Sequence, residues 1–149
     1  MKFKGDIIIT DPCYIFRDED WDKYCEDFND SFIKELGFTN YIWESTIYGD
    51  WSCTTINKDT NEKIGRFCAD AGLVGVFLKD EVDKYNPNFL KDYSSHTRTI
   101  IKDFDGDIQY IVQELENNNT EEDEDYYEEE EAQIHGKGNI NFFTTQTAF

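Results

Sequence analysis

The chain has 149 residues, with 33 Asp and Glu against 14 Lys and Arg, and therefore a formal net charge of −19. This length corresponds to one domain, so we expect a single domain over residues 1–149, and its 12 Phe, 9 Tyr and 3 Trp residues can supply a packed core. Binding to a nucleic-acid backbone relies on Lys and Arg, and we therefore expect no direct binding to DNA or RNA.

The sequence also carries signals about location. No apolar run approaches the roughly 20 residues that a membrane helix needs, and Met1 to Thr10 lacks the apolar region of a signal peptide. We therefore expect a cytoplasmic protein without membrane association. Without C-x-x-C spacing, we expect reduced thiols rather than disulfides at the four cysteines, Cys13, Cys25, Cys53 and Cys68.

The first third of the chain predicts a strand and a helix. The β-branched run 6–10 predicts a buried strand that breaks at Asp11-Pro12 and resumes over 14–16. From Asp18 to Leu36, apolar residues recur at spacings of three and four, which predicts an amphipathic helix that Asn29-Asp30-Ser31 could interrupt.

From residue 41 the sequence favours strands. Residues 41–48 and 51–56 predict a hairpin, and the runs 64–68 and 73–78 predict two further strands. One or two helical turns are expected over 79–85, followed by a loop over 88–95.

Two more hairpins are predicted towards the C-terminus. Asp105-Gly106 lies between the runs 97–104 and 107–114 and is the strongest turn signal in the chain. The last hairpin is expected over 132–145, with its turn at Gly136-Lys137-Gly138.

An acidic segment lies between these hairpins. Glu114 to Glu131 contains eleven acidic residues and no basic one, which predicts a mobile acidic loop at about 115–131, with a strand resuming from Tyr126. The whole pattern predicts a mainly β (α+β) fold, an antiparallel barrel or sandwich of about eight short strands with one amphipathic helix near the N-terminus.

The segment Thr10 to Tyr14 brings a carboxylate, a thiol and a phenol to the predicted strand break. Cys13 could act as a nucleophile beside Asp11, but no cationic or histidine neighbour lies close in sequence to lower its pKa. The sequence favours the alternative, in which Asp11 caps a turn and Cys13 and Tyr14 enter the core.

Aromatic residues of the predicted hairpin could form a pocket. Trp43 and Trp51 could stack on a ring while Arg66 or Arg98 contacts a phosphate, although core packing explains the same aromatics. Arg66 lies on a strand predicted to face inward near Asp70, where a charge must be paired.

Other patterns for chemistry are weak. Neither His96 nor His135 matches the H-x-[ST] pattern of two-histidine phosphoesterases, and the acidic residues around Gly106 have the wrong spacing for a calcium loop. We expect no catalytic residue, no metal and no cofactor. The candidate ligand-binding residues are Asp11, Tyr14, Trp43, Trp51, Arg66, Asp70, His96 and Arg98.

Several motifs carry a resemblance. Ile-Ile-Thr-Asp-Pro-Cys-Tyr over 8–14, Gly-Asp-Trp over 49–51, Phe-Cys-Ala-Asp-Ala-Gly over 67–72 and Gly-Lys-Gly-Asn-Ile over 136–140 resemble a group of small uncharacterised proteins from bacteria and their phages. The resemblance implies no role for any residue. It implies a context in which small proteins often bind components of host defence and block them.

Two functions from different classes follow. The first is a non-enzymatic protein that binds a small molecule, such as a nucleotide signal, as a phage-type counter-defence sponge. The alternative is an acidic mimic of nucleic acid that inhibits a basic protein partner. Unpaired edge strands also favour a homo-oligomer, and an enzyme that uses Cys13 has no motif in its support.

Overall fold

The computed structural model describes residues 1–27, 30–46, 51–115 and 129–147. The strands of this part are β1 (Lys2–Thr10), β2 (Tyr41–Ser45), β3 (Trp51–Asn57), β4 (Lys63–Ala69), β5 (Leu73–Leu78), β6 (Arg98–Leu115), β7 (Glu129–Gly138) and β8 (Phe142–Thr147). The helices are α1 (Pro12–Ile15), α2 (Asp18–Asp27), α3 (Asp30–Glu35), α4 (Lys79–Tyr85) and α5 (Phe89–Asp92), with a 3-10 turn η1 (Ser95–Thr97).

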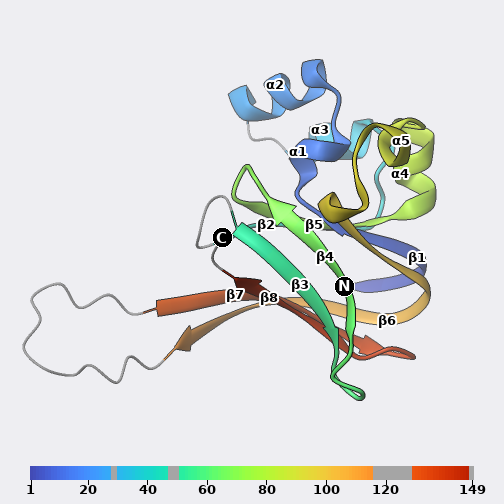
Figure 1. Ribbon diagram of the computed structural model, residues 1–149. Helices are drawn as coiled ribbons and strands as arrows, with labels where there is room; N and C mark the ends of the chain where they lie inside the picture. Colours follow the sequence, from blue (N-terminus) through green and yellow to red (C-terminus); the bar gives the residue numbers. More distant parts are fainter. Residues whose placement is uncertain (28–29, 47–50, 116–128, 148–149) are drawn as a thin grey trace, which may run out of the picture.

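All eight strands lie in one open antiparallel sheet, in the order β2-β5-β1-β6-β7-β8-β3-β4 (Figure 1). The long strand β6 pairs with β1 over its first half and with β7 over its second half. A register shift between Gly5 and Ile7 and a positive φ of 52° at Asp103 mark irregularities in the neighbouring strands β1 and β6. The mainly β, antiparallel expectation is therefore confirmed, whereas the finer expectation of a barrel or sandwich is not.

The concave side of the sheet encloses the larger of two cores. Thr55 of β3 and Thr99 of β6 are buried, and their hydroxyl oxygens lie 3.1 Å apart, so the far end of the sheet curls back towards its middle. This inner core consists of Phe3, Ile7, Ile9, Cys53, Phe67, Ala69, Val74, Val76, Ile101, Phe104, Ile108, Ile134 and Phe142.

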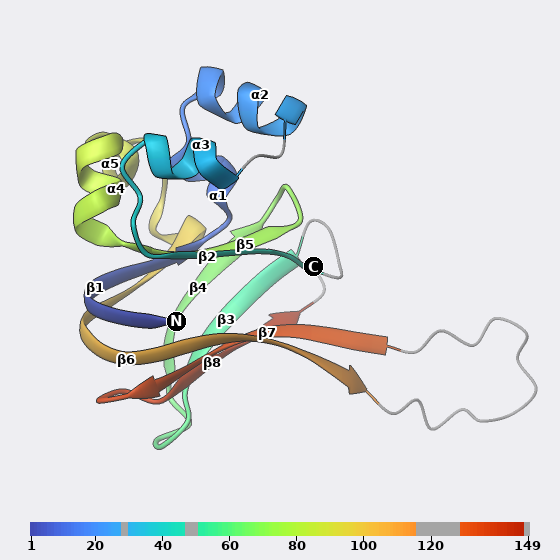
Figure 2. The same cartoon turned by 180° about the vertical axis from the view of Figure 1, so that it is seen from behind.

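The helices form a second core on the opposite face of β1 and β5. Ile8 and Phe77 point towards the helices because side chains alternate along a strand. They pack against Ile15, Phe16, Ile33, Phe38, Val82, Tyr85 and Phe89. Figures 1 and 2 show all the helices gathered over this end of the sheet, which leaves the outer side of β6, β7 and β8 without a helical cover.

The prediction of a turn at Asp105-Gly106 is wrong. Residues 98–115 form one continuous strand, and Gly106 has no positive φ. A Cβ atom at Gly106 would lie 2.3 Å from the backbone oxygen of Lys137 on β7, so the glycine allows a close approach of two strands and does not serve a turn.

The predicted hairpin of residues 41–56 is also wrong, because β2 pairs with β5 while β3 pairs with β4 and β8. The last hairpin is confirmed in kind: β7 and β8 pair, with the turn three residues later than predicted.

Of the predictions for the helical segments, some are confirmed and others are not. The helical turns at 79–85 are confirmed as α4. Residues 14–16 were expected to resume the strand, but Tyr14 and Ile15 belong to α1 and Phe16 is its C-cap. The expected loop over 88–95 contains α5. A single helix over 18–36 is not confirmed, since α2 and α3 occupy this stretch and residues 28–29 lie outside the described part. In the described part of the chain, no helix is long and apolar enough to cross a membrane.

Candidate functional site

Most of the sequence-predicted site residues come together beside the segment that joins β4 to β5. We call this group the Asp11 cluster; it consists of Asp11, Tyr14, Asp70, Tyr93, His96 and Arg98. Its members come from the N-cap and first turn of α1, from the β4–β5 connection, from the segment between α5 and β6, and from the first residue of β6.

Asp11 is fully buried and caps α1. Its Oδ1 accepts a hydrogen bond from the backbone N–H of Cys13 at 2.9 Å, and its Oδ2 accepts from Ala71 at 2.8 Å and from Leu73 at 3.3 Å. Burial raises the pKa of the Asp11 carboxyl, while these backbone donors oppose the rise. The expected capping role is confirmed, and the carboxylate holds the β4–β5 connection against α1.

Tyr14 and Arg98 secure the other side of the cluster. The hydroxyl of Tyr14 donates to a carboxylate oxygen of Asp70, and its ring meets that of Tyr93 at a centroid distance of 5.2 Å. The Arg98 guanidinium donates to the backbone oxygens of Tyr93, of Ser94 at 2.9 Å and of Leu90 at 3.4 Å. Arg98 therefore holds the α5–η1 segment in place.

Two cysteines, Cys13 and Cys68, lie near the cluster. Burial, followed by the negative charge of Asp11, raises the pKa of the Cys13 thiol far above its usual range, so the thiol stays protonated at neutral pH. The Sγ of Cys68 lies 3.5 Å from the backbone oxygen of His96, as a weak donor. His96 itself is exposed.

The two tryptophans of the predicted pocket belong to strands β2 and β3, which are not neighbours in the sheet. Trp43 packs in the helix-covered core, 4.9 Å between ring centroids from Phe16 and 4.6 Å from Tyr24. It also lines a shallow cavity of about 390 Å³ beside the edge strand β2. Trp51 begins β3, and its side chain lies outside the described residues.

A different group of polar residues occupies the convex side of the sheet. Because directly paired residues in an antiparallel sheet share a face, the register gives two rows across neighbouring strands. The first row is Lys63, Ile56, Phe143, His135 and Gln109. The second is Arg66, Thr54 and Thr145. We call this surface, together with Lys58 and Lys137, the outer sheet face.

Arg66 belongs to this face and not to the interior. It lies opposite Thr54, and the next residue along β4, Phe67, is fully buried in the inner core. The expectation that Arg66 faces inward is therefore wrong, because the alternation on β4 places Phe67 and Ala69 inside.

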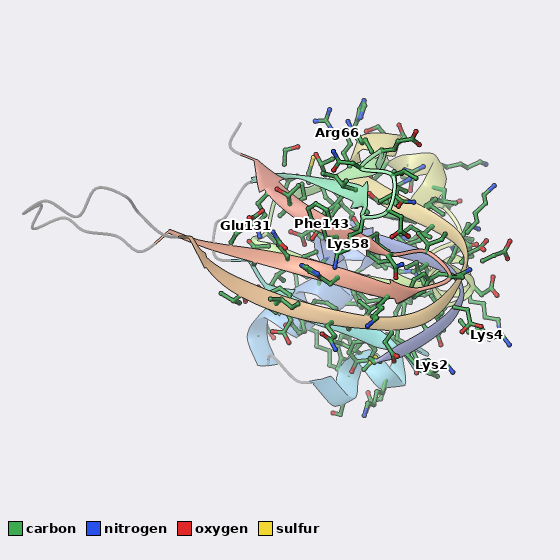
Figure 3. The ribbon with its side chains drawn as sticks, turned by 90° about the horizontal axis from the view of Figure 1, so that it is seen from below. Lys2, Lys4, Lys58, Arg66, Glu131 and Phe143 are labelled. Carbon is green, nitrogen blue, oxygen red and sulfur yellow. The ribbon has the colours of Figure 1, made fainter. Side chains whose placement is uncertain are left out.

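A hollow of about 260 Å³ lies at one end of the outer sheet face, and we call it the Lys58 hollow. Its lining combines two lysines, a histidine and one carboxylate with neutral groups: Met1, Lys58, Asp107, Gln109, Ile111, His135 and Lys137. Figure 3 shows Lys58 and Phe143 over the outer side of β7, with Arg66 further along the sheet.

His135 links the hollow to its neighbours. Its Nδ1 lies 2.8 Å from the Nζ of Lys58 and its Nε2 lies 2.6 Å from the Oε1 of Gln133. Burial and the adjacent Lys58 ammonium lower the pKa of the imidazole, so at neutral pH Nδ1 accepts from Lys58 and Nε2–H donates to Gln133. The ring of Phe143 lies 6.1 Å from that of His135.

The described part of the chain shows few ion pairs. Within residues 1–27, 30–46, 51–115 and 129–147 the one ion pair within 4.0 Å joins Lys79 to Asp83 on α4. Among these residues, no carboxylate lies within 4.0 Å of the charged groups of Lys58, Lys137 and Arg66.

Sequence reasoning missed Lys58, His135 and Lys137 as a group. A usable signal was present, since Glu131, Gln133, His135 and Lys137 alternate with small or apolar residues, which is typical of a strand with one polar face. The proximity of Lys58 depends on the pairing of β3 with β8 and had no local signature.

No family model, curated protein or solved structure matches the chain. Among the side chains that the structure describes, no group of three or more His, Cys, Asp or Glu residues could hold a metal ion.

Proposed function

We propose that this protein is a non-enzymatic binding protein for a small anionic ligand of the nucleotide class, held at the Lys58 hollow. The observation that carries the proposal is a hollow lined by Lys58 and Lys137, which have no carboxylate within 4.0 Å among the described residues of this strongly acidic chain. In such a chain, local positive potential at a concave site is what attracts an anion against the overall charge.

The hollow offers complementary groups for a nucleotide. The ammonium groups of Lys58 and Lys137 can hold a phosphate. The Asp107 carboxylate can accept hydrogen bonds from sugar hydroxyls, and the Gln109 amide can both donate to and accept from a base edge. Lys58 can turn from the neutral His135 to the ligand at little cost, since no ion pair is broken.

A role in holding the ligand rather than converting it fits the chemistry of the candidate nucleophile. The Cys13 thiol is protonated at neutral pH, and the carboxylate beside it is fully committed to backbone donors. In the context that the resemblance implies, we propose that the protein sequesters a nucleotide signal of a defence system, as a sponge.

The proposal is tested by calorimetric titration of the protein with AMP. In the double variant Lys58→Gln/Lys137→Gln we expect at least about tenfold weaker binding. The matched control Lys84→Gln/Lys91→Gln removes two exposed lysines of α4 and α5 and should bind as the unchanged protein does. Equal losses in both variants would show that net charge, and not this site, governs binding.

A second candidate function is inhibition of a basic protein partner through acidic mimicry of nucleic acid. The observation in its favour is α2, which presents Asp18, Glu19 and Asp20 in its first turn. Most of the acidic segment 115–131 lies outside the described residues. Deletion of residues 116–128 should abolish inhibition under this alternative and leave AMP binding intact under the first proposal.

A further inference from the structure

The cations of the outer sheet face extend beyond the Lys58 hollow. Lys63 and Arg66 lie on the edge strand β4, on the same side of the sheet as the hollow, because their paired residues Ile56 and Thr54 belong to that side. Three strand spacings separate β7 from β4, or about 14 Å across the sheet. One phosphate cannot contact both ends of such a surface.

Apolar side chains lie between these two groups of cations. Phe143 is half-buried and is paired with His135 on one side and with Ile56 on the other. Its neighbours in the next row are the small hydroxyl residues Thr145 and Thr54. An accessible aromatic ring on a sheet is a surface on which a nucleobase stacks, whatever the base.

We propose that the site extends from the Lys58 hollow across Phe143 to Lys63 and Arg66, and that the ligand is a dinucleotide with two separated phosphates. This inference rests on the proposed function. One phosphate binds between Lys58 and Lys137, a base stacks on Phe143, and the second phosphate is bound by Arg66 with Lys63 beside it.

Charge complementarity supports this occupant over others. Within the described residues the guanidinium group of Arg66 has no carboxylate within 4.0 Å, although acidic residues outnumber basic ones more than twofold in the chain. The guanidinium group binds phosphate in a two-pronged geometry that a lysine cannot provide. Glu131 lies on the same side of β7, beyond the hollow towards the acidic segment, so it limits the anionic ligand to the cationic end of the face (Figure 3).

The test compares two probes, AMP and the linear dinucleotide pApA, by calorimetric titration. The unchanged protein should bind pApA at least about tenfold more tightly than AMP. Arg66→Gln should remove most of this preference and leave the affinity for AMP unchanged. Phe143→Leu should weaken both probes, and Lys91→Gln on α5, which removes the same charge elsewhere, should weaken neither.

The possible results separate the inference from the proposed function. Equal affinities for AMP and pApA, or an unchanged preference in Arg66→Gln, would overturn the extended site while AMP binding at Lys58 still stood. Absence of binding by both probes would overturn both proposals. A preference for pApA that Arg66→Gln abolishes supports the dinucleotide site.

Discussion

The Asp11 cluster and the outer sheet face are both rich in polar side chains, but they use them differently. In the Asp11 cluster, the buried Asp11 accepts from backbone N–H groups, and the half-buried Arg98 donates to backbone oxygens. On the outer sheet face, Lys58, Lys137 and Arg66 have no carboxylate within 4.0 Å among the described residues. We infer from this comparison that the hydrogen-bonded groups of the cluster hold the fold, whereas the proposed binding depends on the cations of the outer sheet face.

The largest expected effect is on stability, from a change in the cluster. Asp11→Ala leaves the buried N–H groups of Cys13, Ala71 and Leu73 without their acceptor and should lower the free energy of unfolding by about 3 kcal/mol. Urea denaturation measures it, with the exposed Asp22→Ala on α2 as control. A loss no larger than that of the control would mean that the cluster does not hold the fold.

A matched pair of arginine variants sharpens the comparison. Arg98→Gln removes donors to three backbone oxygens and should lower the free energy of unfolding by about 2 kcal/mol. Arg66→Gln removes no such bond and should change it by less than about 0.5 kcal/mol. Urea denaturation measures both changes. Similar losses of unfolding free energy in the two variants would show that Arg66 supports the fold as much as Arg98 does.

For the lysines of the hollow, we expect a loss of binding without a loss of stability. Lys58→Gln/Lys137→Gln should weaken AMP binding at least about tenfold, equivalent to about 1.4 kcal/mol, while the urea midpoint stays the same. Binding should also weaken with added salt, since the contacts are between charges. Unfolding of the double variant at lower urea, with binding retained, would assign these lysines to the fold.

The smallest expected effect is a pH dependence at His135. Its pKa is lowered in the folded protein, so between that value and the ordinary value near 6.5 the unfolded chain binds more protons. The free energy of unfolding should therefore fall as the pH drops below about 6.5, by less than about 1 kcal/mol, and the fall should be smaller in His135→Gln. An identical pH profile in the variant would show that His135 is not held neutral.

The sequence predicted strands and their faces better than their partners. Apolar runs such as 73–78 reported correctly that β5 is buried. The pairing of the strands was not predicted. The sequence of β2 and β3 is typical of a hairpin, but the two strands lie towards opposite ends of the sheet. Gly106 was misinterpreted for a related reason, because the backbone of β7 that requires a glycine there lies about thirty residues away.

In the candidate sites, too, local patterns were predictable and contacts between distant segments were not. Asp11 was interpretable as a cap from its place before Pro12, a purely local pattern. Lys58 and His135 are 77 residues apart in the sequence, so no local pattern could show that they lie together. Arg66 was assigned to the interior, but the regular alternation along β4 places Phe67 and Ala69 inside and Arg66 outside.

Native mass spectrometry of the protein purified from its host shows whether a nucleotide occupies the Lys58 hollow. We expect one small molecule per chain, released on denaturation with the mass of a nucleotide, which is absent from Lys58→Gln/Lys137→Gln but present in Lys84→Gln/Lys91→Gln. A mass equal to that of the chain alone in the unchanged protein, together with no uptake of added AMP or pApA, would contradict it.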